Sequence, residues 1–177
     1  MERRLFFWEW AGFALTALLA PLTARLYGWS GGAPLAGAFF PVNGSVWEAM
    51  KALYLPVFLF SMVQFWAMGR EYPGLPAVRA VSALAGLALL PVLRYTYAGA
   101  LGFRLLWADR AAFLLADLGL FCLDLRLLRR SRRTAVWRQV LGMLVLWGLV
   151  FLFVFHTFRP PRLALWQDPA SGIPGRG

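Results

Sequence analysis

The sequence has almost none of the residues that form disulfides and transition-metal sites. Its 177 residues include one cysteine, Cys122, and one histidine, His156. A single cysteine excludes an intrachain disulfide and a thiolate metal cluster, and one histidine among scattered acids does not supply the ligands of a zinc site. The sequence therefore predicts neither a metal site nor a cofactor. We interpret His156 as a helix-end histidine held by a hydrogen bond.

Charged residues are also scarce, at 15% of the chain, whereas 60% of the residues are hydrophobic and the mean hydropathy is +0.62. A soluble domain of this length carries about 25% charged residues. This composition excludes a water-soluble globule and predicts an integral membrane protein. The net charge of +10 comes from arginines that interrupt apolar runs, which is typical of contact with anionic lipid headgroups and not of nucleic-acid binding.

Five apolar segments are long enough to cross a hydrocarbon core, which requires roughly 20 helical residues. We predict an all-α integral membrane protein, a bundle of five transmembrane helices in a single membrane domain over residues 1–177. The predicted helices span residues 6–24, 46–69, 77–93, 105–125 and 136–158. Glu9 interrupts the first segment and no small-residue cleavage site follows it, so we interpret that segment as a retained helix and not as a signal peptide.

The dense, acid-free arginine run between residues 126 and 133 predicts the orientation, because cytoplasmic loops are enriched in basic residues. The N-terminus is then cytoplasmic and the C-terminus extracytoplasmic, in the cell (inner) membrane of a bacterium. The orientation also uses a count of the arginines and lysines near the predicted helix ends, and this count includes Lys51 and Arg79.

This orientation places three polar segments on the extracytoplasmic side. They are the first loop at 27–45, the loop at 95–104 and the tail at 159–177. The tail contains apolar residues and a turn sequence, which is not typical of a disordered terminus. We therefore expect it to fold over the outer face of the bundle.

Three stretches combine polar, aromatic and proline residues in patterns that the apolar segments lack. They are Pro41–Lys51 (PVNGSVWEAMK), Arg94–Gly102 (RYTYAGALG) with the nearby Asp109, and His156–Gly172 (HTFRPPRLALWQDPASG). Together they resemble an uncharacterised family of bacterial multi-pass membrane proteins, a domain of unknown function with PVNESVWEH-K, YTYTG-LG and TF-PP--PLF-DP-TG-YG motifs. The resemblance covers nearly the whole chain, and it implies an integral membrane protein with no assigned activity.

The chain departs from the family pattern at three positions. Gly44 stands where the pattern has Glu, Ala49 where it has His, and Pro174 where it has Tyr. A glutamate and a histidine together would indicate an acid–base or metal site. The loss of both argues against such chemistry in this chain.

The polar residues of the three motifs form a candidate cluster on the predicted outer face. Its members are Asn43, Glu48, Lys51, Arg94, Tyr95, Asp109, His156, Arg159 and Asp168.

Several members of this cluster also have structural interpretations. Ser45 and Glu48 fit a capping box at a helix start, and Glu48 can pair with Lys51 at i, i+3. Trp47 fits the interfacial aromatic belt. Asp109 can form an ion pair with an arginine on the same side of the membrane, which is Arg94, Arg104 or Arg110.

Asp117 lies near the predicted bilayer centre, where an acid costs roughly 2.5–3.5 kcal/mol. It shares a helix face with Asp109 and Asp124, which suggests a proton or cation path. The structural alternative is a protonated Asp117 that is bonded to a neighbouring Ser, Thr or backbone carbonyl.

Three functional hypotheses follow. The first is a non-catalytic accessory or binding protein with a polar site on its outer face; its partners would be the lipid bilayer, another membrane protein or a second copy of the chain. The second is an intramembrane enzyme acting on lipid or envelope substrates, which requires Glu48, Asp109 and His156 to converge around a cavity. The third is a transporter or proton-coupled component, which requires a hydrated route to Asp117.

Overall fold

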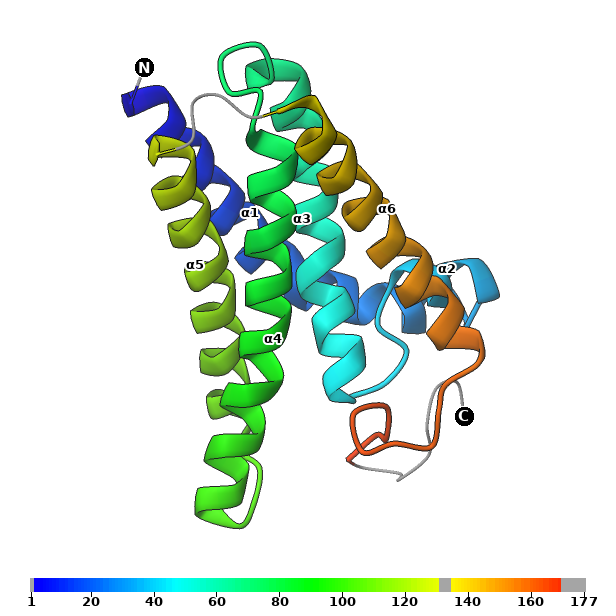
Figure 1. The fold of residues 1–177 in the computed structure, drawn as a ribbon. Helices are drawn as coiled ribbons and strands as arrows, with labels where there is room; N and C mark the ends of the chain where they lie inside the picture. Colours follow the sequence, from blue (N-terminus) through cyan, green and yellow to red (C-terminus); the bar gives the residue numbers. More distant parts are fainter. Residues whose placement is uncertain (1, 131–134, 170–177) are drawn as a thin grey trace.

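The computed structural model describes residues 2–130 and 135–169, in which six α-helices make up the regular structure (Figure 1). The helices are α1 (Glu2–Trp29), α2 (Pro34–Phe39), α3 (Val46–Met68), α4 (Leu75–Leu101), α5 (Leu106–Arg130) and α6 (Val136–Phe158). All five predicted segments are helical, and α2 is an additional short helix inside the predicted first loop. Residues 131–134 of the arginine run and 170–177 of the tail lie outside the described residues.

Four helices, α1, α3, α4 and α6, are long and apolar enough to cross a membrane. The predicted all-α class is thus confirmed, and the four candidate spans support the predicted multi-pass membrane character. The 25-residue α5 has the length, but five charged residues interrupt its apolar sequence: Asp109, Arg110, Asp117, Asp124 and Arg126.

The helix α4 continues about two turns beyond its predicted end at residue 93. It passes Pro91 and Arg94 and ends at Leu101, where Gly102 adopts a φ of 77°. This left-handed conformation closes a helix and favours glycine. The predicted loop at 95–104 is therefore wrong for residues 95–101, because Arg94 ends the apolar run without ending the helix.

The most buried helix is α3, which packs against α1 and α4, while α6 packs mainly against α4 (Figure 1). Leu53, Tyr54 and Val57 are completely buried, and the Tyr54 hydroxyl donates a hydrogen bond to the Leu146 carbonyl oxygen at 2.5 Å. In a bilayer the close packing of side chains and such interhelical bonds hold helices together, since lipid is as apolar as the core.

The two ends of the bundle are formed by different parts of the chain (Figure 1). The N-terminus, the α3–α4 turn and the end of α5 lie at one end. At the other lie α2, the start of α3, the α4–α5 turn and residues 160–169. We call the second end the motif end, because it carries the polar residues of the three motifs.

The helices α1 and α5 are close together away from the motif end and diverge towards it. A β-carbon added at Gly12 of α1 would lie 2.4 Å from the Phe121 ring of α5, so the two helices touch there. Beyond this contact α1 crosses behind α3 towards α2, whereas α5 continues beside α4 (Figure 1). Their divergence leaves room for a cavity at the motif end.

Candidate functional site

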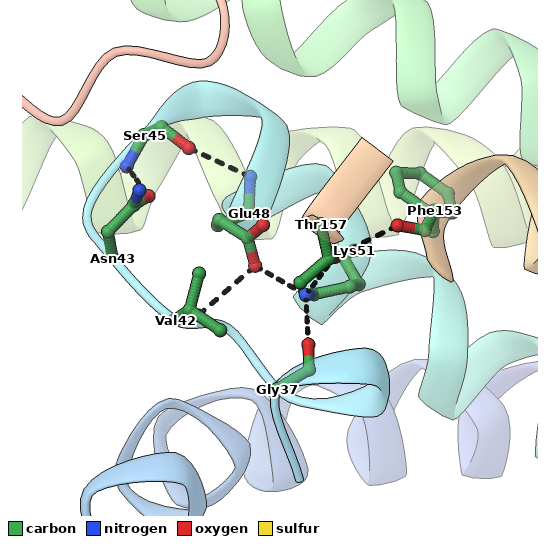
Figure 2. Close-up of polar contacts among 8 residues, drawn as sticks. All are labelled: Gly37, Val42, Asn43, Ser45, Glu48, Lys51, Phe153 and Thr157. Carbon is green, nitrogen blue, oxygen red and sulfur yellow. Dashed lines mark hydrogen bonds and ion pairs between the residues drawn. The ribbon is translucent and has the colours of Figure 1, made fainter. Parts of the chain in front are cut away.

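A buried ion pair between Glu48 and Lys51 joins three parts of the motif end. The Lys51 Nζ lies 2.6 Å from the Glu48 Oε2. It also donates hydrogen bonds of 2.9 Å to the Gly37 carbonyl oxygen and to the Thr157 hydroxyl, and the Val42 amide donates to the Glu48 Oε2 at 3.1 Å. Figure 2 shows these partners surrounding the two side chains. All three ammonium protons of Lys51 thus have an acceptor, and the pair fastens α2 and α6 to the start of α3.

The turn before α3 caps the helix through two side chains. The Ser45 Oγ accepts a hydrogen bond from the Glu48 amide at 3.2 Å, as the predicted capping box requires. The reciprocal bond, from the Ser45 amide to the Glu48 carboxylate, does not form. That amide donates instead to the Asn43 Oδ1 at 2.9 Å, and the carboxylate turns to Lys51 and the Val42 amide. This half of the capping-box prediction is wrong because the lysine holds the carboxylate elsewhere.

An aromatic cluster covers the first turn of α3. Trp47 stacks on Trp166 with ring centroids 4.6 Å apart, and it also contacts the rings of Phe153 and His156. Its backbone amide donates to the Leu165 carbonyl oxygen at 2.9 Å. Trp47 is almost completely buried. Its predicted place in the interfacial aromatic belt is therefore wrong, because the C-terminal segment covers it.

The described part of the tail, residues 160–169, crosses the start of α3. Besides the tryptophan stack, the Gly44 amide donates to the Asp168 Oδ1 at 3.3 Å. At the end of α6, the His156 Nδ1 lies 2.9 Å from the Leu152 carbonyl oxygen. The histidine is thus a hydrogen-bonded helix-end residue within an aromatic cluster.

Asp109 is the centre of a second polar group, formed by the end of α4 and the start of α5. The Arg104 Nη2 lies 2.8 Å from the Asp109 Oδ2, and the Arg94 Nε lies 3.4 Å from the Oδ1. The Tyr97 hydroxyl donates to the same Oδ1 at 2.5 Å. The predicted ion pair of Asp109 is confirmed, and it involves two arginines together with a tyrosine.

The diverging helices enclose a cavity of about 700 Å³ at the motif end. Four arginines and one acid line it, namely Arg25, Arg94, Arg104, Arg110 and Asp109. Most of its remaining wall is apolar, and it is formed by Ala17, Ala20, Pro21, Ala24, Pro41, Ala49, Ala52, Leu106, Phe113 and Leu114.

A smaller cavity of about 350 Å³ lies beside the C-terminal segment. Its lining includes Tyr95 and Asp168 together with Arg94 and Arg104, which also line the larger cavity. The two arginines that hold Asp109 are thus accessible from both cavities.

A third polar group is buried nearer the opposite end of the bundle. The Arg79 guanidinium lies 2.6 Å from the Asp124 Oδ2 and 3.2 Å from the Glu9 Oε2. It donates to the Gln64 Oε1 at 2.5 Å, and the Gln64 amide donates to the Glu9 Oε1 at 2.7 Å. We call these four residues the buried network. It joins α1, α3, α4 and α5.

Two of the charges counted to predict the orientation are buried inside the bundle. Arg79, in the buried network, and Lys51, paired with Glu48, are both completely buried. Both lie within the first two turns of their helices, as counted. Each is paired inside the bundle with carboxylates from the same helix or other parts of the chain, so neither is an exposed flanking charge.

Asp117 is completely buried, between Asp109 and Asp124 along α5. Its carboxylate oxygens have no hydrogen-bond partner among the described residues, so the predicted bond to a neighbouring hydroxyl or carbonyl is not present there. Asp117 lines neither of the two cavities at the motif end.

A family model described as a family of unknown function (DUF6512) matches residues 3–175. The chain belongs to this family. The resemblance drawn from the three motifs is thereby confirmed, since the match includes all of them. Among curated proteins and among solved structures, none matches the chain. Membership of DUF6512 therefore establishes a domain of unknown function, and the four candidate spans indicate a multi-pass membrane protein.

In this DUF6512 chain the predicted outer cluster separates into several groups. The larger cavity is lined by three of its members, Asn43, Arg94 and Asp109. The smaller cavity is lined by Arg94 and two others, Tyr95 and Asp168. The remaining four line neither cavity: Glu48 and Lys51 in the buried pair, His156 in the aromatic cluster and Arg159 at the end of α6.

The enzyme hypothesis requires Glu48, Asp109 and His156 to meet around one cavity. In this structure Glu48 is bound to Lys51 and a backbone amide, and His156 packs against tryptophans. Asp109 alone of the three lines the larger cavity. Among the described residues, these three side chains therefore do not form a common site for acid–base catalysis.

Four residues of the cavity and its polar centre were absent from the predicted cluster: Arg25, Tyr97, Arg104 and Arg110. Each lies within a few residues of a predicted helix end, where a basic or aromatic residue usually serves as an anchor. The sequence did show several arginines on the predicted outer side. It did not show that these arginines lie close together in the fold.

Proposed function

We propose that this protein is a non-catalytic membrane protein that binds an anionic ligand in the larger cavity at the motif end. The charge of the lining supports this most directly. Four arginines face one aspartate, and four minus one leaves a surplus of three positive charges. The volume of about 700 Å³ lies within the range of sites for small ligands.

The chemistry of the lining suits recognition of an oxyanion. Guanidinium groups bind carboxylates and phosphates through paired hydrogen bonds, and they remain charged in apolar surroundings. Arg94 and Arg104 already hold the carboxylate of Asp109. The site therefore contains one internal anion and has positive charge remaining for a second one.

We further propose that α5 crosses the membrane with the other four long helices. Its two deeper acids, Asp117 and Asp124, are completely buried inside the bundle, whereas its exposed positions include Leu114, Leu115 and Cys122. A helix with its deeper acids inside and apolar residues outside is compatible with lipid. The arginines at its end, Arg129 and Arg130 among them, support a cytoplasmic location for that end.

With five spans, the motif end is extracytoplasmic. The larger cavity then opens at the outer leaflet of the membrane. This orientation rests on the basic residues between α5 and α6, and cysteine labelling from each side of the membrane tests it.

Anion binding is tested with the purified protein in an uncharged detergent. The probes are glycerol 1-phosphate and phosphatidylglycerol, and the readout is bound probe in native mass spectra. The Arg94→Gln/Arg104→Gln variant should bind at least about tenfold more weakly, because each lost hydrogen bond to a charged group weakens binding by about that factor. Arg70→Gln is the matched control, since Arg70 is exposed at the opposite end. Failure of the wild-type protein to bind either probe would overturn the proposed function.

A further inference from the structure

The larger cavity has a side that faces the bilayer. Its α1 and α5 walls include exposed residues, among them Pro21, Leu106 and Leu114. Leu106 is 68% exposed. Because α1 and α5 touch at Gly12 and Phe121 and then diverge, the opening between them widens towards the motif end. In a membrane this opening is filled by lipid.

The walls of the opening suit a hydrocarbon chain. On the α1 side the lining contains three alanines, at 17, 20 and 24, together with Pro21 and, at the motif end, Arg25. On the α5 side Phe113 and Leu114 supply an apolar surface. The alanines of α1 leave space between the two helices, and the part of that space that lies between them and Phe113 and Leu114 is apolar. A soluble anion would gain nothing from these walls.

The polar part of the cavity lies at the end of the apolar walls. Arg94, Arg104 and Tyr97 surround one Asp109 carboxylate. The Arg94 Nε lies 3.4 Å from Asp109 without a hydrogen bond to the described residues. Arg94 and Arg104 both line the cavity, so their guanidinium groups can donate hydrogen bonds to a further anionic oxygen. A phosphate group presents more oxygens than a carboxylate and matches the guanidinium fork.

We infer that the cavity admits a phosphate-bearing anionic lipid sideways from the bilayer, between α1 and α5. The lipid phosphate binds Arg94 and Arg104 in competition with Asp109, and one acyl chain lies along Ala20, Ala24 and Leu114. This inference rests on the proposed anion binding and adds its source, the membrane. Asp109 acts as an internal stand-in that keeps the two arginines paired while the site is empty of lipid.

The charge of the lining selects among lipids. The surplus of three positive charges favours a headgroup with net negative charge. A zwitterionic headgroup would bring an ammonium among the arginines, and the one acid in the lining, Asp109, is already held by them. Phosphatidylglycerol should therefore bind better than phosphatidylcholine.

The experiment compares lipid with soluble phosphate on variants that block one feature each. Purified full-length protein is mixed in an uncharged detergent with phosphatidylglycerol, phosphatidylcholine or glycerol 1-phosphate, and bound probe is measured by native mass spectrometry. Ala24→Trp places a large side chain in the α1–α5 opening, and Ala14→Trp is its control on an exposed position of α1 that lines neither cavity. Asp109→Asn removes the competing anion.

We expect phosphatidylglycerol to bind at least about tenfold more tightly than either other probe. Ala24→Trp should reduce its binding by a similar factor while Ala14→Trp leaves it unchanged, and Asp109→Asn should increase it. If glycerol 1-phosphate binds as tightly as the lipid, and Ala24→Trp has no effect, the lipid inference is wrong while anion binding stands; the smaller cavity would then be the route from water to Arg94 and Arg104. If neither phosphatidylglycerol nor glycerol 1-phosphate binds, the proposed function fails together with the inference.

Discussion

Two buried cations show how single residues stabilise this bundle. Lys51 and Arg79 are completely buried, and each has a carboxylate within 2.6 Å. A buried charge is tolerated when its partners satisfy it, and removing one partner is costly because the other is left uncompensated. Both residues therefore fix the relative positions of helices that the apolar core alone would leave free to slide.

The Lys51→Met variant should lower the free energy of unfolding by about 3–5 kcal/mol, because Glu48 would remain buried without its counter-ion. Unfolding of the detergent-solubilised protein by added sodium dodecyl sulfate measures this change. The double variant Glu48→Gln/Lys51→Met removes both charges and should recover most of the loss. A single variant as stable as the wild-type protein would contradict the assignment.

Contacts between residues that are close in the sequence could be predicted, whereas most contacts between different helices could not. The Glu48–Lys51 pair and the Ser45 cap are local, so spacing along one helix was enough to suggest them. Arg79 meets acids from α1 and α5, and its pairing depends on how three helices pack. Nothing within its own segment distinguishes it from an exposed arginine such as Arg70.

At the scale of elements, the interiors of the helices could be predicted from the sequence, whereas their ends could not. Apolar runs predicted five helices because a spanning helix needs about 20 apolar residues. They did not predict that α4 extends to Leu101, since the end depends on Gly102 and on polar residues that remain helical beyond the apolar run. Nor did they predict α2, whose six residues are held by the bond from Lys51 to Gly37.

Glycine spacing sets how closely α6 approaches α4. A β-carbon at Gly142 would lie 2.6 Å from backbone atoms of Pro76 and Ala77, whereas one at Gly148 has nothing within 4 Å. Gly142→Ala should therefore destabilise the protein by about 1–3 kcal/mol, because the backbone cannot yield as a side chain can. Gly148→Ala, on the same helix, should be neutral or stabilising by up to about 1 kcal/mol. Equal unfolding curves for the two variants would show that α6 does not pack as described.

At the scale of the whole molecule, the same four helices form both the buried network and the larger cavity. Glu9, Gln64, Arg79 and Asp124 hold α1, α3, α4 and α5 together at one end. At the motif end α1 and α5 are farther apart, and residues of all four helices line the cavity of about 700 Å³. Because the buried network holds the four helices together at one end, they can be separated by a cavity at the other end while the bundle stays folded.

This arrangement has a topological consequence that cysteine labelling can test. At about 1.5 Å per residue, the 25 residues of α5 span roughly 37 Å, enough to cross a bilayer core of about 30 Å. We expect Phe103 and Arg130, which flank α5, to lie on opposite sides of the membrane. In a Cys122→Ala background, a membrane-impermeant maleimide added to intact spheroplasts should label Phe103→Cys.

The reagent should label Arg130→Cys only after the membrane is permeabilised. Gly28→Cys, near the end of α1, should behave like Phe103→Cys, and Arg70→Cys should behave like Arg130→Cys. If Phe103→Cys and Arg130→Cys react from the same side, α5 does not cross the membrane. If all four react with the sides exchanged, the motif end is cytoplasmic, and the larger cavity would then draw its lipid from the inner leaflet.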